Sequence, residues 1–370
     1  MRAGASGYIG RFMTGRLGDG PASGQPDAGQ AALVGAAERA WRRLVPGAAG
    51  PSQVSIVEVS DKSAVFRLTG VGPGGSAVIA KRCRAATAMI ERTIYKEILP
   101  QLPVSTIACY GVAPDQETAF AWLFIEDLGD AQLLEDGHRV MAARWLGEMH
   151  VAAATLGDTA RLPGRDPAYF FSRLRGVRRF LLAKATGPWL SVHERRVLDA
   201  VKAQCDVLET HWEEIEAFIE GMPRTLVHGD FVALNLRLRQ NAAGPTLVAF
   251  DWEKAGWGTP LIDLVDVDLP SYWRVVKGWW PQLSIADVEK SARYAVIFGA
   301  LNQEWTRKPM RKIAKRRKRM ARALAALGWV DEPQRGDGWT AEESQRESCQ
   351  ANRPCQLPRP GVLTTKDEGP

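Results

Sequence analysis

The stretch LVHGDFVALNLRLRQNAAGPTLVAFDWEKAG, residues 226–256, decides the fold of this chain. Asp230 follows a short apolar strand and a glycine, which predicts that its carboxylate projects into a cleft. Two further apolar runs, LNLRLR and TLVAF, are joined by turn-forming residues, which predicts an antiparallel hairpin. Such a hairpin brings Asp251, at the end of its second strand, back beside Asn235, near the start of its first. The sequence therefore predicts that three oxygen-bearing side chains meet at one place.

These three side chains match what a magnesium-bound phosphate requires. Mg²⁺ takes oxygen ligands, few from the protein and several from phosphates and water. One carboxylate and one amide oxygen suit the metal, and a second carboxylate beside them can orient or deprotonate a hydroxyl nucleophile. A Gly-Asp pair alone indicates only a turn. The combination HGDxxxxN followed by Asp251-Trp252-Glu253 at a strand end is a specific signal for phosphoryl transfer.

The rest of the chain divides by composition into two lobes and two tails. Residues 1–50 are rich in Gly, Ala, Pro and Ser and are expected to be disordered, apart from a candidate helix at 31–44. Residues 51–126 show the pattern of short strands, and residues 127–330 show a mainly helical one. Residues 331–370 are polar and rich in turn-forming residues, so we expect a disordered tail. The predicted fold class is α+β, with a small antiparallel sheet and one helix joined to a larger helical lobe.

The small lobe contains a cation and an acid that are expected to pair. In SAVIAKRC, alternation along the strand places Lys81 within an otherwise apolar run. In the helix predicted at 86–100, Glu91 lies within the apolar stripe, one turn before Tyr95, where a carboxylate is costly unless it is paired. Lys81 is the evident partner, and a Lys–Glu pair of this kind aligns the phosphates of ATP. Glu97 is the second candidate, and the alternative for Lys81 is a solvent-exposed charge at a strand end.

Here the sequence resembles the aminoglycoside phosphotransferase and choline kinase-like family, relatives of protein kinases that phosphorylate small molecules. The resemblance covers about residues 53–305 and implies a two-lobed, protein-kinase-like fold that uses ATP and Mg²⁺. It implies that Asp230 is the catalytic base and that Asn235 and Asp251 are the metal ligands. The residues that carry the resemblance are His228-Gly229-Asp230, Asn235, Asp251-Trp252-Glu253 and Gly258-x-Pro260-x-x-Asp263-Leu264.

The same resemblance implies further contacts with ATP and further supports. The strand FAWLFIEDLGD resembles the hinge between the lobes, so backbone groups near Glu126 and Leu128 would bind the adenine edge. The turn that should cover the phosphates, VEVSDKSAVF, contains no glycine, and Ser60 and Ser63 are expected to contribute hydroxyl and backbone contacts there. Among the supports, Asp263 is expected to brace the catalytic loop, while His228 and His150 are expected to be structural residues.

The implied activity is transfer of phosphate from ATP to a hydroxyl group of a small molecule, such as a sugar, an amino alcohol, an antibiotic or a related metabolite. The acceptor is expected against the C-terminal helices, whose aromatic residues either stack on it or, as the favoured interpretation, fill the core. Because these helices contain few acids and many bases, we expect a neutral or anionic acceptor rather than an aminoglycoside. The alternative from another class is a catalytically silent, kinase-like binding protein. The aromatic residues in question are Tyr272, Trp273, Trp279, Trp280 and Trp305.

The net charge of +6 is concentrated in one segment. Residues 307–322, RKPMRKIAKRRKRMAR, contain ten Lys or Arg and no acid. The favoured interpretation is a solvated helix face. The alternative is a surface for an anionic partner, which could be nucleic acid, acidic lipid or an acidic protein surface; with nucleic acid, the chain would be a nucleic-acid-associated protein.

The sequence also bears on where the protein works. No apolar run approaches the ~18–20 residues that a membrane helix needs. The N-terminus lacks the continuous apolar core of a secretory signal. The five cysteines are scattered without a CxxC pair, as is typical of a reduced protein. We therefore expect a cytoplasmic protein with no membrane span.

Overall fold

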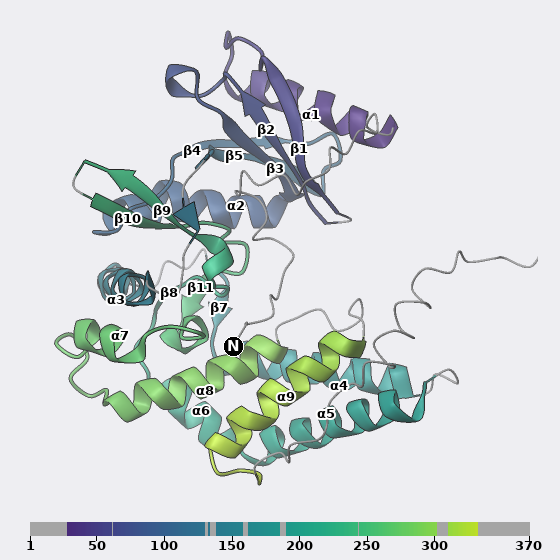
Figure 1. Ribbon diagram of the computed structural model, residues 1–370, viewed down its shortest axis with the longest axis vertical. Coiled ribbons are helices and arrows are strands. Elements are labelled where there is room, and N and C mark those ends of the chain that lie inside the picture. Colours follow the sequence, from purple (N-terminus) through teal and green to yellow (C-terminus); the bar gives the residue numbers. More distant parts are fainter. Residues whose placement is uncertain are drawn as a thin grey trace, which may run out of the picture.

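The two expected lobes are present in a computed structural model of the chain (Figure 1). The upper lobe is built on a sheet, and the lower lobe is mainly helical, as the sequence predicts. The expected disorder at 1–27 and 332–370 concerns residues outside those that the structure describes. The described residues are 28–60, 62–129, 132–133, 138–157, 162–185, 190–242, 244–301 and 310–331.

The small lobe contains a five-stranded antiparallel sheet, in which the third strand pairs with the second and the fifth. Its central strands are apolar at successive positions, so both faces of the sheet must be covered. The strand order is β1-β2-β3-β5-β4. The strands are β1 (Gln53–Val59), β2 (Ala64–Thr69), β3 (Val78–Arg84), β4 (Cys109–Pro114) and β5 (Phe120–Glu126).

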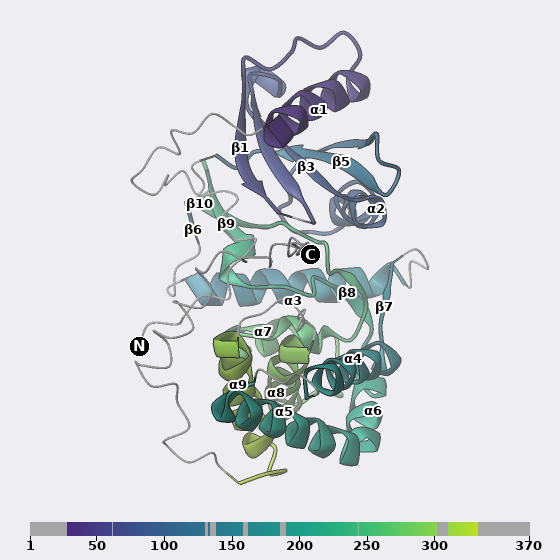
Figure 2. The same cartoon turned by 90° about the vertical axis from the view of Figure 1, so that its right-hand side faces the viewer.

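Two helices cover the two faces of this sheet (Figure 2). Helix α1 (Ala28–Leu44) packs its buried Trp41 against Phe124 and the residues that share its face. Helix α2 (Ala85–Thr93) covers the opposite face, from which Lys81 projects. The helix expected at 31–44 is therefore present, and it belongs to the core of the small lobe instead of a separate extension.

The helix expected at 86–100 is regular only in its first half. Helix α2 continues into a π-turn at Ile94–Ile98 and a 3₁₀ turn at Leu99–Gln101. Pro100 has no N–H to donate, so a regular α-helix could not continue through it without losing a hydrogen bond. Isolated π-turns are frequent at functional sites, and this one contains Tyr95.

Below the small lobe, one buried helix supports the elements that carry the decisive stretch. Helix α3 (Arg139–Thr155) is buried along most of its length and lies below the hairpin in both views (Figures 1 and 2). Two three-stranded sheets adjoin it, with the orders β10-β9-β6 and β7-β11-β8. Their strands are β6 (Gln132–Leu133), β7 (Gly164–Arg165), β8 (Thr225–Val227), β9 (Leu236–Asn241), β10 (Gly244–Ala249) and β11 (Gly256–Gly258).

The remaining helices surround a second apolar core in the large lobe. Within the region expected to be mainly helical, His211 separates two helices. None of the helices that the structure describes combines the length and the apolar character needed to span a bilayer. The helices are α4 (Pro167–Ala185), α5 (Val192–Thr210), α6 (Trp212–Glu220), α7 (Leu269–Val276), α8 (Ile285–Leu301) and α9 (Met310–Ala326).

Helix α9 contains residues 310–322 of the basic segment, and residues 307–309 are not among those that the structure describes. Its apolar side packs on α5 and α8 through residues such as Ile313 and Leu324. Four of its cations, at spacings of four, four and three residues, form an exposed row that we call the basic stripe. These residues are Arg311, Lys315, Arg319 and Arg322.

Candidate active site

The catalytic loop, residues 228–235, connects β8 to β9 and carries Asp230 near its tip. Gly229 has a φ of +76°, and a Cβ atom there would lie 2.3 Å from the backbone oxygen of Lys254. Both the left-handed conformation and this close approach require glycine. The loop therefore packs directly against the segment that follows Asp251.

The Asp263 carboxylate fixes the catalytic loop through hydrogen bonds to its backbone. One of its carboxylate oxygens accepts a 2.6 Å hydrogen bond from the His228 backbone N–H, and the other accepts one of 2.7 Å from Gly229 N–H. Its carboxylate also lies 3.2 Å from His150 Nε2. Asp263 and both histidines are completely buried, so the predicted bracing role is confirmed.

His228 supports the loop and the strand beside it. Its Nε2 donates a hydrogen bond of 3.0 Å to the backbone oxygen of Phe250. Burial lowers the pKa of His228 below its usual value, which keeps the ring neutral. A buried neutral imidazole that donates to a carbonyl group is a structural support, as the sequence predicts.

The predicted hairpin brings Asn235 and Asp251 together. β9 and β10 pair in the register Leu236↔Ala249, and Phe250 N–H donates to the Asn235 backbone oxygen at 3.1 Å. Asn235 Nδ2 donates to the backbone oxygen of Asp230 at 3.0 Å, which leaves its amide oxygen available. Asp251 has a φ of +66°, a strained conformation of the kind that clusters at functional sites.

The oxygens around Asp251 suit a hard cation. Its Oδ1 accepts from Lys81, while its Oδ2 is buried without a hydrogen-bond partner among the described residues. Its backbone N–H donates to the Tyr95 hydroxyl at 3.2 Å. No group of three or more His, Cys, Asp or Glu side chains in the described part of the chain could hold a metal. The unpartnered Asp251 Oδ2 and the Asn235 amide oxygen fit Mg²⁺ that takes its other ligands from phosphate and water.

The predicted Lys81–Glu91 ion pair is present, and it extends across the lobes to Asp251. Lys81 Nζ lies 2.6 Å from Glu91 Oε1 and 2.7 Å from Asp251 Oδ1. Burial favours the neutral amine, but Asp251 and Glu91 outweigh it and raise the pKa of Lys81 above its usual value. Burial raises the pKa of Glu91 to about 7, against the pull of Lys81. Glu97, the second candidate, forms an ion pair with Arg92 instead.

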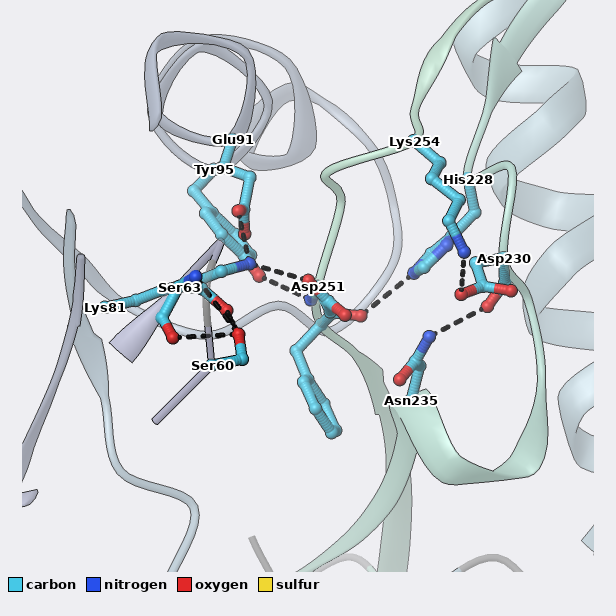
Figure 3. Close-up of polar contacts among 11 residues, drawn as sticks. Ser60, Ser63, Lys81, Glu91, Tyr95, His228, Asp230, Asn235, Asp251 and Lys254 are labelled. Carbon is cyan, nitrogen blue, oxygen red and sulfur yellow. Dashed lines mark hydrogen bonds and ion pairs between the residues drawn. The ribbon is translucent and has the colours of Figure 1, made fainter. Parts of the chain in front are cut away.

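The other residues expected to contact ATP lie in the small lobe and at the hinge. Ser60 Oγ bonds the backbone oxygen and N–H of Ser63, at 3.0 and 3.2 Å, and Figure 3 draws both beside Lys81. The Glu126 carboxylate is occupied by Arg239, at 2.7 Å, and by a backbone N–H of the small lobe. Leu128 is buried. The Glu126 backbone N–H also donates to the Ala108 backbone oxygen at 2.8 Å, so the predicted adenine contact at this position stays a prediction.

Two residues of the site were not anticipated from the sequence. Lys254 Nζ lies 2.7 Å from Asp230 Oδ2, and Figure 3 shows it reaching this carboxylate opposite Asn235. Arg165, in β7, donates to the backbone oxygen of Lys254 at 3.1 and 2.8 Å. A cation three positions after Asp251 was a visible signal for Lys254. Arg165 lies in a two-residue strand, and no pattern in the sequence marked it.

Comparison with known proteins agrees with this geometry. The profile of the phosphotransferase enzyme family matches residues 56–283, more than half of the chain. The chain belongs to this family. None of the curated proteins matches it in sequence. The predicted family resemblance is thereby confirmed.

Solved structures similar to this family member share its fold at low sequence identity. The GDP and kanamycin complex of APH(2″)-IIIa has a TM-score of 0.52 at 11% identity, over 78% of this chain and 96% of that one. Choline kinase from Cryptosporidium parvum Iowa II has a TM-score of 0.52 at 10% identity, over 81% and 97%. The GDP complex of aminoglycoside 2′-phosphotransferase-IIIa has a TM-score of 0.50 at 11% identity, over 85% and 97%. The predicted kinase-like fold is confirmed.

Proposed function

We propose that this chain transfers the terminal phosphate of ATP, with Mg²⁺, to a hydroxyl group of a small molecule in the cytoplasm. The observation that carries the proposal is that two carboxylates and one amide oxygen lie together beside a lysine that forms an ion pair across the lobes. Membership of the phosphotransferase family supports the reaction class. The nucleotides named for two of the similar structures support a nucleotide donor. The residues concerned are Asp230, Asn235, Asp251, Lys81 and Glu91.

In the proposed reaction the protein positions charge around the phosphate. When bound, Mg²⁺ would neutralise charge on the phosphates, and the oxygens of Asn235 and Asp251 would hold it. Lys81, oriented by Glu91, would bind the phosphates that remain with ADP. Asp230 would accept the proton of the acceptor hydroxyl while the hydroxyl oxygen forms a bond to the γ-phosphorus. The bond between that phosphorus and the β,γ-bridging oxygen breaks, and ADP leaves.

The surroundings of the site favour a neutral or anionic acceptor. The acids on α5 and α6 that could have held a polycation are partly engaged, because Asp206 and Glu209 pair with Arg178 and Glu214 pairs with Lys290. Of the aromatic residues considered for stacking, Tyr272 and Trp280 are buried, while Trp279 is 64% exposed. Trp305 lies outside the described residues. The candidate acceptors therefore include sugars, amino alcohols, hydroxyl-bearing antibiotics and related metabolites, with polycations the least favoured.

The proposal is tested by following ADP release with Mg·ATP and a panel of these acceptors. We expect Asp230→Asn to lower kcat by about 10²–10⁴-fold, the usual contribution of a general base, while the affinity for Mg·ADP stays within twofold. Asp199→Asn, an exposed aspartate of α5, is the control and should match the wild type. Stabilisation by Mg·ATP without ADP release on any acceptor would favour the silent, kinase-like binding protein. Failure to bind any nucleotide would contradict both.

A further inference from the structure

Lys254 is a partly buried ammonium in contact with the proposed base. Its side chain is 28% exposed, that of Asp230 is 23% exposed, and the ion pair between them is 2.7 Å long. Burial alone would favour a neutral amine, but Asp230 outweighs it and raises the pKa of Lys254 above its usual value. The lysine is therefore charged at neutral pH. In this state it occupies Asp230 Oδ2, one of the two oxygens that could accept a proton.

The backbone of Lys254 is fixed from two sides. Arg165 donates from Nε and Nη2 to the Lys254 backbone oxygen, and from Nη2 to that of Ala255 at 2.8 Å. Arg165 is buried and forms no ion pair with any residue that the structure describes. Gly229 packs on the same oxygen from the catalytic loop. The guanidinium also lies 4.4 Å from the centre of the Tyr169 ring. The backbone of Lys254 is therefore held by Arg165 on one side and by the catalytic loop on the other.

The position of Lys254 places its charge against the proposed base and close enough to the proposed metal ligand Asp251 for their charges to interact. It lies three residues after Asp251, and its Nζ contacts Asp230, the proposed base. The catalytic loop, HGDFVALN, contains no Lys or Arg. Lys81 is already engaged by Glu91 and Asp251. Among the described residues, Lys254 is the one cation that contacts Asp230.

We propose that Lys254 binds the terminal phosphate of the nucleotide and releases Asp230 as it does so. The inference rests on the proposed function and names a phosphate-binding residue for it. With phosphate present, the ammonium exchanges a carboxylate for a group of greater negative charge, and Asp230 Oδ2 becomes free for the acceptor hydroxyl. Without nucleotide, the ion pair keeps the base occupied. The γ-phosphate and the base are thereby coupled through one side chain.

The test compares two nucleotides that differ in the terminal phosphate. Affinities for Mg·ADP and for the magnesium complex of β,γ-imido-ATP are measured by calorimetry on the wild type, Lys254→Met and Lys254→Arg. A lost charge-assisted hydrogen bond should weaken the triphosphate analogue by about tenfold or more in Lys254→Met. The affinity for Mg·ADP should stay within twofold, and Lys254→Arg should recover most of the loss. In turnover, Lys254→Met should lower kcat more than it changes KM for the acceptor.

The matched control is Lys290→Met, which removes a lysine of similar exposure from a 2.9 Å ion pair with Glu214 in the same lobe. It should leave both affinities unchanged. Equal losses for the two nucleotides in Lys254→Met would make Lys254 a brace of the loop, and no loss for either would remove it from the phosphate site. Both results overturn the inference but leave the proposed function standing. A wild-type protein that binds neither nucleotide would instead overturn the proposed function.

Discussion

At the scale of single residues, Glu91 and Asp251 share the one ammonium of Lys81 in a buried site. Burial raises the pKa of Glu91 to about 7, so between its usual value and about 7 the folded protein holds a proton that the unfolded chain has released. Ionising Glu91 therefore lowers the free energy of unfolding as pH rises through this window.

We expect the wild type to lose stability, relative to Glu91→Gln, between pH 5 and 8. Denaturant unfolding of both proteins across this range measures the difference. A stability difference that is flat, or that rises with pH, would contradict the raised pKa.

Gly229 allows a second residue-scale prediction, because it combines a left-handed backbone with a close contact. Gly328 has the same φ of +76° but would meet no atom within 4 Å if it carried a Cβ. Gly328→Ala should therefore cost about 1–2 kcal/mol, the penalty of the left-handed conformation alone. Gly229→Ala adds a 2.3 Å clash with the Lys254 backbone and should cost clearly more. Thermal or denaturant unfolding measures both, and equal costs would show that the loop and the Lys254 segment can move apart.

The sequence alone predicted the residues of the site whose contacts follow from a local hairpin or from a charge on an apolar face. Asn235 and Asp251 flank a single hairpin, so turn chemistry and alternation were enough to bring them together. Lys81 and Glu91 were predicted because a charge on an apolar face needs a partner. Lys254 escaped prediction because its contact with Asp230 depends on how the segment after Asp251 crosses the loop. Arg165 was not predicted because it donates to backbone carbonyl groups, and every residue has one, so the sequence does not indicate which residues it contacts.

At the scale of elements, helix α1 was the feature that the sequence underestimated. The strands AVFRLT and FAWLFIE are apolar at adjacent positions, and such strands need cover on both faces. The predicted lobe contained only one covering helix, so a second cover was required. The need for a second covering helix was visible in the strands. The Gly- and Ala-rich composition of the N-terminal segment suggested disorder instead.

The packing of α1 leads to a prediction about Trp41. It is 2% exposed and lies against Phe124 with ring centroids 5.3 Å apart. Trp41→Ala should destabilise the protein by about 3–5 kcal/mol, the usual cost of removing a large core aromatic residue. Trp279→Ala, at a tryptophan that is 64% exposed, is the control and should cost less than about 0.5 kcal/mol. Comparable effects at the two sites in a urea titration would mean that α1 is not part of the core.

At the scale of the whole molecule, the two lobes are joined at the site itself. Lys81, on the sheet, reaches Asp251, after the hairpin, and Arg239, in the hairpin, reaches Glu126, at the hinge. One ion pair lies where the proposal places the phosphates of ATP, and the other lies where it places the adenine ring. The mutual orientation of the lobes therefore depends on groups that the nucleotide would contact. The charge of the molecule is distributed differently, because its basic excess lies on α9, in the large lobe.

The basic stripe gives the last prediction, which tests the alternative of an anionic partner against the favoured interpretation of a solvated helix face. If that alternative holds, single-stranded RNA of about 20 nucleotides binds weakly, with a slope of log affinity against log salt of about −3, as expected for four phosphate contacts. Replacing all four residues of the stripe by Gln should abolish binding and leave affinity for Mg·ADP unchanged, because α9 is held by its apolar side. A control with the same change in charge replaces four exposed arginines elsewhere, Arg39, Arg144, Arg175 and Arg179, and should retain most of the binding. Equal losses in the two variants, or no binding at low salt, would leave the stripe as a solvated helix face.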